Sequence, residues 1–135
     1  MALVKNIMSK PAVTVQPSAT IYDAARQMKD AKIGSLIITD DKDRPLGIIT
    51  ETDIIYKVVA EGRALDTPVK DVMTTDLKTI DEEETVEKAA KIMAAHLIRR
   101  LPVVKNKKLT GIVALKDVVK AKKVNSESEY YPYYT

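Results

Sequence analysis

The chain has 135 residues, of which 45% are hydrophobic and 30% charged, with a net charge of +3 and no Cys, Trp or Phe. Without cysteine it has no disulfide, thiolate metal site or cysteine nucleophile, and its single histidine, His96, nearly excludes a histidine zinc site or a Ser-His-Asp triad. Because it lacks both a membrane-length apolar run and a signal peptide, we expect a soluble, cytoplasmic protein.

The sequence contains an internal repeat. The opening VKNIM at 4–8 recurs as VKDVM at 69–73, and a second shared segment, Gly47-Ile48 followed by Asp53, recurs as Gly111-Ile112 followed by Asp117. Two units of about 60 residues therefore make up the chain. Because a unit of this size buries little core alone, we expect the two to pack on each other.

Both repeats are expected to contain the same elements in the same order. The first has an extended segment (12–15), a helix with apolar Ile21, Ala24, Ala25 and Met28, a strand (35–39), a turn (40–45), a strand (46–49) and a helix from Glu51. The second has them at 77–80, around Val86, Ala89, Ala90 and Met93, at 101–104, 105–108 and 109–113, and from Leu115. The continuous apolar character of 35–39 predicts a strand buried on both faces.

The predicted fold class is α/β (α+β), with the order β-α-β-β-α twice. We place the first domain at 1–62 and the second at 63–124, with a linker at 61–68 where Gly62 and Pro68 mark the break. The Tyr-rich tail, 125–135, has no periodicity and is expected to be flexible unless a partner orders it.

The segment Gly47–Asp53 is the most informative for function. It places Thr50 at a helix N-cap and Asp53 three residues later. The helix start could hold a phosphate with help from the Thr hydroxyl, while the carboxylate accepts the hydroxyls of a ribose. Alternatively, the two residues form a capping box, which the spacing alone favours.

The second repeat shifts this balance. Its equivalent residues are Ala114, which cannot cap a helix through its side chain, and Asp117. A reciprocal capping box therefore does not explain Asp117, although the helix dipole still could. The comparison favours a ligand role for both Asp residues.

Other polar features have simpler explanations. Arg99 and Arg100 precede a buried strand and could face either phosphates or solvent. The acidic run 81–84 precedes a helix start, which it would stabilise, and it has no spaced partner for a metal. We expect His96 to be a partly exposed helix residue, and we assign no metal ligands and no catalytic residues.

The chain resembles a tandem pair of CBS (cystathionine-β-synthase) domains, a Bateman module of the stand-alone prokaryotic or archaeal type, over residues 4–123. The resemblance rests on the repeated opening, on the segment Ile98–Val104 (IRRLPVV) and on the two Gly-to-Asp segments. It implies two repeats packed about a pseudo-twofold axis. It also implies two clefts that bind AMP, ADP, ATP or S-adenosylmethionine, each cleft shared between the repeats.

The resemblance also implies which residues bind the ligand. Site one would comprise Thr50, Asp53, Leu77, Lys78, Ile98, Arg99, Arg100 and Pro102. Site two would comprise Asp117, Ala12, Val13, Ile33, Gly34 and Ser35. Because site two has Ala114 in place of the usual Thr or Ser and lacks the Arg pair, we expect site one to bind nucleotide phosphates more tightly.

The function implied is that of a regulatory sensor without catalysis, which forms a homodimer through its helices and signals to a separate effector protein. An alternative is nucleic-acid binding through a basic rim of Arg99, Arg100, Lys105, Lys107 and Lys108, although balanced charge and few aromatics disfavour it. An enzyme acting on a nucleotide is disfavoured because no paired carboxylates, metal cluster or activated nucleophile can be assigned.

Overall fold

The computed structural model describes residues 2–125, and the chain divides into two compact units. One is Val13–Leu77, and the other combines Met1–Ala12 with Lys78–Thr135. They are called here the 13–77 unit and the 78–125 unit, the latter including the N-terminal segment. None of the helices in the described part of the chain is long and apolar enough to cross a membrane.

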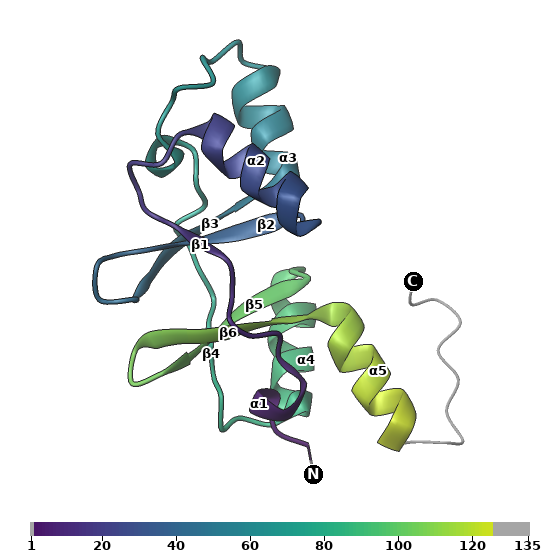
Figure 1. The fold of residues 1–135 in the computed structure, drawn as a ribbon. Helices are drawn as coiled ribbons and strands as arrows, with labels where there is room; N and C mark the ends of the chain where they lie inside the picture. The colour runs from purple at the N-terminus through teal and green to yellow at the C-terminus, as the bar shows by residue number, and fades with distance from the viewer. Residues whose placement is uncertain (1, 126–135) are drawn as a thin grey trace. The chain divides into compact units, whose positions relative to one another are not determined.

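The 13–77 unit is a three-stranded sheet with helices on one face (Figure 1). Its elements are β1 (Thr14–Val15), α2 (Ile21–Ala31), β2 (Ser35–Thr39), β3 (Pro45–Thr50), α3 (Glu51–Asp53), the π-helix η1 (Ile54–Val59) and the 3-10 turn η2 (Val69–Asp71). The strand order is β1-β2-β3, with β1 parallel and β3 antiparallel to β2. Leu36, Ile38 and Ile49 of the sheet pack against Ile21, Ala24 and Met28 of α2 and Val58 of η1.

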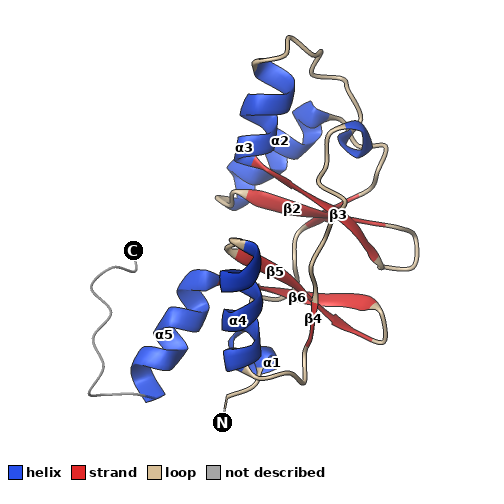
Figure 2. Cartoon of the chain, turned by 180° about the vertical axis from the view of Figure 1, so that it is seen from behind, coloured by secondary structure: helices blue, strands red, loops and turns tan. Residues whose placement is uncertain are grey.

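The 78–125 unit repeats this arrangement (Figure 2). Its elements are α1 (Val4–Ile7), β4 (Ile80–Asp81), α4 (Val86–His96), β5 (Arg100–Lys105), β6 (Lys108–Ala114) and α5 (Leu115–Asn125). The order is β4-β5-β6, again with one parallel and one antiparallel pair. The predicted α+β class and the duplicated β-α-β-β-α order are therefore confirmed.

Local sequence accounts for most element boundaries. The long helices begin at the N-caps Thr20 and Thr85, whose hydroxyls accept the backbone N–H groups three residues later. They end where Lys32 and Leu97 adopt left-handed backbone conformations, with φ of 58° and 54°. All five residues of β2 are buried, as its continuous apolar sequence predicts.

The closing helices of the two repeats differ in geometry. In the second repeat α5 is an α-helix throughout, whereas in the first a short α3 passes into the π-helix η1. The prediction of an ordinary helix from Glu51 was therefore only partly right. The π-helical run begins with Ile54, Ile55 and Tyr56, and β-branched and aromatic residues have low α-helix propensity.

The opening segments of the two repeats are exchanged between the units. Val4 is fully buried in the 78–125 core, whereas Val69 is fully buried in the 13–77 core. The compact units therefore divide the chain differently from the sequence repeats, because each core contains the opening segment of the other repeat. The proposed tail lies outside the described residues, except Asn125, which ends α5.

The exchange depends on glycine at two equivalent strand positions. Thr74 pairs with Ile48 through two backbone hydrogen bonds, and Ser9 pairs with Ile112 in the same way. A Cβ atom on Gly47 would lie 2.8 Å from both the Thr74 carbonyl oxygen and the Met73 sulfur. The equivalent distances at Gly111 are 2.8 Å to the Ser9 oxygen and 2.7 Å to the Met8 sulfur. The repeated Met and Gly of the two motifs are thus contact partners.

We expect Gly47→Ala and Gly111→Ala each to lower the free energy of unfolding by about 1–3 kcal/mol, the usual effect of forcing an extra carbon into a packed site. Urea unfolding measures it. In a Met73→Ala background the added cost of Gly47→Ala should be smaller but not zero, because the Thr74 carbonyl oxygen still blocks the Cβ. A loss below about 0.5 kcal/mol would show that the segments separate freely.

Candidate functional site

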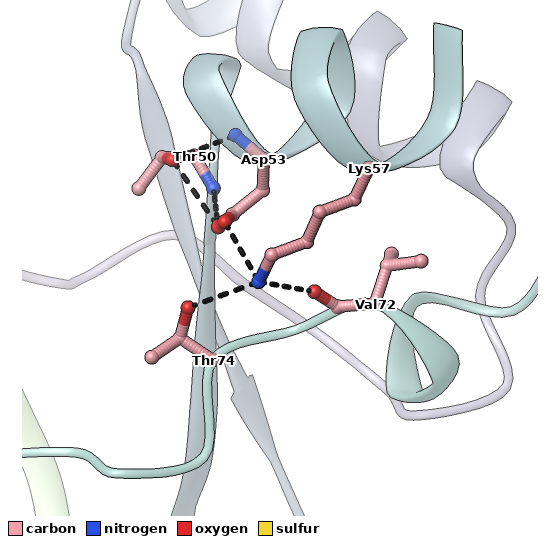
Figure 3. Close-up of polar contacts among 5 residues, drawn as sticks. All are labelled: Thr50, Asp53, Lys57, Val72 and Thr74. Atoms are coloured by element: carbon pink, nitrogen blue, oxygen red, sulfur yellow. Dashed lines mark hydrogen bonds and ion pairs between the residues drawn. The ribbon is translucent and has the colours of Figure 1, made fainter. Parts of the chain in front are cut away.

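A polar cluster surrounds Asp53 where β3 passes into α3 (Figure 3). Its Oδ2 accepts hydrogen bonds from the Thr50 backbone N–H at 3.0 Å and from the Thr50 hydroxyl at 3.2 Å. The Asp53 N–H donates to Thr50 Oγ1 at 3.2 Å. The Asp53 side chain is 12% exposed, so a mostly buried carboxylate is held in one orientation.

Lys57 completes this cluster one helical turn after Asp53. Its ammonium Nζ lies 3.1 Å from Asp53 Oδ1 and also donates to the Val72 carbonyl oxygen at 3.1 Å and to Thr74 Oγ1 at 3.5 Å. The three acceptors converge on one nitrogen (Figure 3). Lys57 therefore joins the carboxylate to the segment that follows η2.

The capping interpretation of Thr50 and Asp53 is confirmed, since both reciprocal hydrogen bonds are present. The same spacing occurs at the start of α2, where Thr20 and Asp23 form the same pair of bonds, at 3.1 and 3.3 Å. Spacing alone thus does not identify a ligand site. Burial and the ion pair with Lys57 distinguish Asp53 from the exposed Asp23.

Asp117 also has a capping role that sequence reasoning missed. Its Oδ2 accepts the Ala114 N–H at 3.1 Å, which is the half of a capping box that needs no hydroxyl at residue 114. The missing hydroxyl at residue 114 rules out only the reciprocal half of the box. The position four residues after Asp117 is Ala121, so this repeat has no counterpart of Lys57.

The N–H groups at the two helix starts are partly used within the protein. Glu51 donates its N–H to the Gly34 carbonyl at 3.1 Å, and Leu115 donates to the Arg99 carbonyl at 2.8 Å. Asp53 already donates to Thr50. At the helix start after β3, two of the N–H groups expected to bind a phosphate are therefore already bonded within the protein. An added positive group becomes more important for phosphate binding there.

The residues predicted for each site come from both units. For site one, Thr50, Asp53 and Leu77 belong to the 13–77 unit, and Lys78, Ile98, Arg99, Arg100 and Pro102 to the 78–125 unit. For site two, Val13, Ile33, Gly34 and Ser35 belong to the 13–77 unit, and Ala12 and Asp117 to the other.

Within each unit, a residue predicted for one site lies beside the strand-to-helix junction of the other site. Ser35 pairs with Thr50 across the β2–β3 ladder, and Arg100 pairs with Ala114 across the β5–β6 ladder. In each unit, the first residue of one hairpin strand thus lies beside the capped junction where the other strand passes into a helix. Of the residues predicted for site one, Arg99 is exposed, Arg100 is half-buried and Pro102 is buried.

Two other sequence features have structural roles. The acidic run before α4 pairs with lysines: Lys5 contacts Glu83 at 2.9 Å, and Lys105 and Lys88 contact Glu82 and Glu84, both at 3.5 Å.

His96 is an exposed residue at the end of α4, slightly more accessible than expected. In the described part of the chain, no group of three or more His, Asp or Glu side chains is arranged to hold a metal ion.

Sequence reasoning missed Lys57. The signal was present, because a Lys four residues after an Asp on a helix favours an ion pair. The contacts with Val72 and Thr74, 15 and 17 residues away, needed the tertiary structure.

Comparison with known proteins agrees with this architecture. The CBS domain model matches residues 4–60 and again residues 69–124. The CBS domain-containing protein YhcV of Bacillus subtilis is 39% identical over 118 residues, covering 87% of this chain and 84% of that protein.

Solved structures show the same fold. A CBS-domain containing protein from Agrobacterium tumefaciens has a TM-score of 0.80 and 33% identity, covering 90% of this chain and 99% of that one. A hexameric CBS-CP12 protein from bloom-forming cyanobacteria has a TM-score of 0.81 and 34% identity, covering 96% and 76%. With two matches of the domain model over most of its length, the chain belongs to the CBS domain family and carries the domain as a tandem pair.

Proposed function

We propose that this protein is a regulatory module that binds an adenosine nucleotide, AMP, ADP or ATP, or S-adenosylmethionine, and signals to a partner protein without catalysing a reaction. The observation that carries the proposal is the oriented, mostly buried Asp53 carboxylate at the strand-to-helix junction of a CBS domain. In this proposal Thr50 and Asp53 act with Leu77, Lys78, Ile98, Arg99, Arg100 and Pro102 as site one.

The chemistry of Asp53 suits a ribose. A carboxylate has about four lone-pair positions, and Thr50 occupies two on Oδ2 while Lys57 occupies one on Oδ1. One position on Oδ1 therefore stays available to a ligand hydroxyl. Because the capping bonds already fix the orientation of the carboxylate, ligand binding would not have to order it.

Site two, with Asp117, Ala12, Val13, Ile33, Gly34 and Ser35, is proposed as the weaker site. Asp117 is held by one backbone N–H, and neither a hydroxyl at residue 114 nor a lysine at residue 121 accompanies it. A nucleotide phosphate would meet fewer donors from this repeat.

We also propose that the module is a homodimer. Supporting this, η1 exposes a run of apolar side chains, with Ile55, Tyr56 and Val59 being 55%, 69% and 65% exposed. Apolar side chains gathered on one helix commonly mark a protein interface.

A thermal-shift panel tests the proposed ligand class. AMP, ADP, ATP, S-adenosylmethionine and NADH are each added at millimolar concentration, with ribose 5-phosphate as the control without a base. A ligand that binds only the folded protein adds about 2.7 kcal/mol of stability at a concentration one hundred times its Kd. At least one adenosine compound should raise the melting temperature more than the control. No shift from any of them would contradict the proposal.

A further inference from the structure

We propose that Lys57 is a specificity-determining residue of site one, selecting adenosine ligands that carry a phosphate over neutral or cationic ones. The inference rests on the proposed function and names the ligand class at the same site. It follows from the position of the Lys57 ammonium, 3.1 Å from the carboxylate oxygen that has a free acceptor position. A ligand hydroxyl on Asp53 would therefore bring the rest of the ligand close to a positive charge.

The three donors of the Lys57 ammonium are unequally engaged. The contacts with Asp53 and the Val72 carbonyl are both 3.1 Å, but the contact with Thr74 Oγ1 is 3.5 Å and exposed. A hydrogen bond of that length is near the limit of a real one, whereas an ammonium–phosphate bond is normally about 2.7–2.9 Å. A phosphate oxygen can thus replace Thr74 while the other two contacts remain.

The Lys57 side chain is accessible enough for this exchange. It is 45% exposed, whereas the Asp53 side chain is 12% exposed. The lysine therefore presents part of its charge to solvent while it is anchored by a mostly buried partner. An anchored lysine has already lost much of the side-chain freedom that phosphate binding would otherwise remove.

The need for such a charge follows from the helix start. The N–H groups of Glu51 and Asp53 have acceptors within the protein, at 3.1 and 3.2 Å. The helix start alone thus offers little to an anion. Lys57 provides the positive group on the same helical segment as Asp53, and it also offsets the carboxylate charge that would repel a phosphate.

Two equivalent positions in the chain show that the lysine is not part of the capping motif. The T-x-x-D segment at Thr20–Asp23 is followed four residues after Asp23 by Gln27, and Asp117 is followed by Ala121. Capping occurs at all three junctions. Only the buried carboxylate of Asp53 has the lysine, so its role is separable from helix capping.

The test compares the affinities of AMP and adenosine by titration calorimetry for the wild type, Lys57→Met and Lys57→Arg, with Lys29→Met as the control on the exposed face of α2. Met keeps the length and helix propensity of Lys without its charge. We expect Lys57→Met to weaken AMP binding about tenfold or more, the usual effect of losing a charged hydrogen bond, while adenosine affinity is unchanged or higher. Lys57→Arg and Lys29→Met should keep the wild-type ratio of the two affinities.

The ratio of the AMP and adenosine affinities distinguishes a role of Lys57 in ligand specificity from a purely structural role. If Lys57 only ties the helix to Val72, then Lys57→Met lowers both affinities together with the melting temperature, and the inference is overturned. An unchanged ratio in a fully folded variant overturns it as well. Wild-type protein that binds none of AMP, ADP, ATP, S-adenosylmethionine and adenosine would instead overturn the proposed function on which the inference rests.

Discussion

Val4→Ala should loosen the sheet of the second repeat rather than that of the first. Val4 is fully buried in the core formed by Ile80, Val86, Leu101 and Val113. Removing two methyl groups from such a site costs about 2 kcal/mol, including the cavity left behind. If this unit opens by itself, amide exchange in β5 and β6 should accelerate about thirtyfold, with β2 and β3 nearly unchanged.

The equivalent substitution in the other core, Val69→Ala, should have the opposite effect on the two sheets. Val69→Ala removes a fully buried side chain from the 13–77 core, so exchange in β2 and β3 should accelerate while β5 and β6 keep their protection. Leu65→Ala, at a 53% exposed position outside the proposed sites and the proposed dimer surface, is the control with little expected effect. Hydrogen exchange read by mass spectrometry or NMR distinguishes the patterns. Equal acceleration of both sheets by Val4→Ala would contradict the prediction of separate cores.

Asp53→Ala should weaken the tighter of two nucleotide-binding events about tenfold or more, while Asp117→Ala affects only the weaker one. Asp53 is the carboxylate accompanied by the Thr50 hydroxyl and the Lys57 ammonium, whereas Asp117 has neither. Losing a charged hydrogen-bonding partner costs about 1.5–3 kcal/mol, or tenfold or more in affinity. Titration calorimetry with AMP measures both events.

The capping role of these carboxylates needs its own control. Loss of an N-cap interaction costs about 0.5–2 kcal/mol of stability, so a weakened affinity could reflect a loosened helix. Asp23→Ala removes the same type of bond from Thr20 at the start of α2, outside both proposed sites. It should lower the melting temperature and leave both binding events intact. Loss of the tighter event in Asp117→Ala would reverse the ranking of the sites.

The contacts around Asp53 and Asp117 explain why we expect the two repeats to differ in ligand affinity, although their backbone arrangement is the same. Both have the same strand-to-helix junction and the same Asp that accepts the N–H three residues earlier. Two of the differences between the junctions bear directly on the carboxylate, Thr50 against Ala114 and Lys57 against Ala121. One repeat thus retains capping alone, while the other surrounds its carboxylate with a hydroxyl and an ammonium.

The element order could be predicted from sequence because it depends on local patterns. The apolar spacing of Ile21, Ala24 and Met28 defines one helix face, and the unbroken apolar run of β2 predicts its burial. The change from α3 to the π-helix η1 could not be predicted, because spacing rules assume a single helical period.

The candidate site was only partly predictable. Thr50 and Asp53 stand at a spacing that predicts a capping box, and the box is present. That spacing is equally compatible with the exposed pair of Thr20 and Asp23, so it cannot separate a structural carboxylate from one with a further role. Burial and the convergence of Lys57 on Val72 and Thr74 make the distinction, and both arise from chain folding over many residues.

By itself the sequence determined that the chain is two copies of one β-α-β-β-α repeat, because hydrophobic periodicity and turn residues act within a few positions of each other. Only the tertiary structure decided which copy of the opening segment completes which core. Since VKNIM and VKDVM carry nearly the same side chains, either could fit either core by composition. The choice follows from chain connectivity and close packing, which place Met8 and Ser9 against Gly111, and Met73 and Thr74 against Gly47.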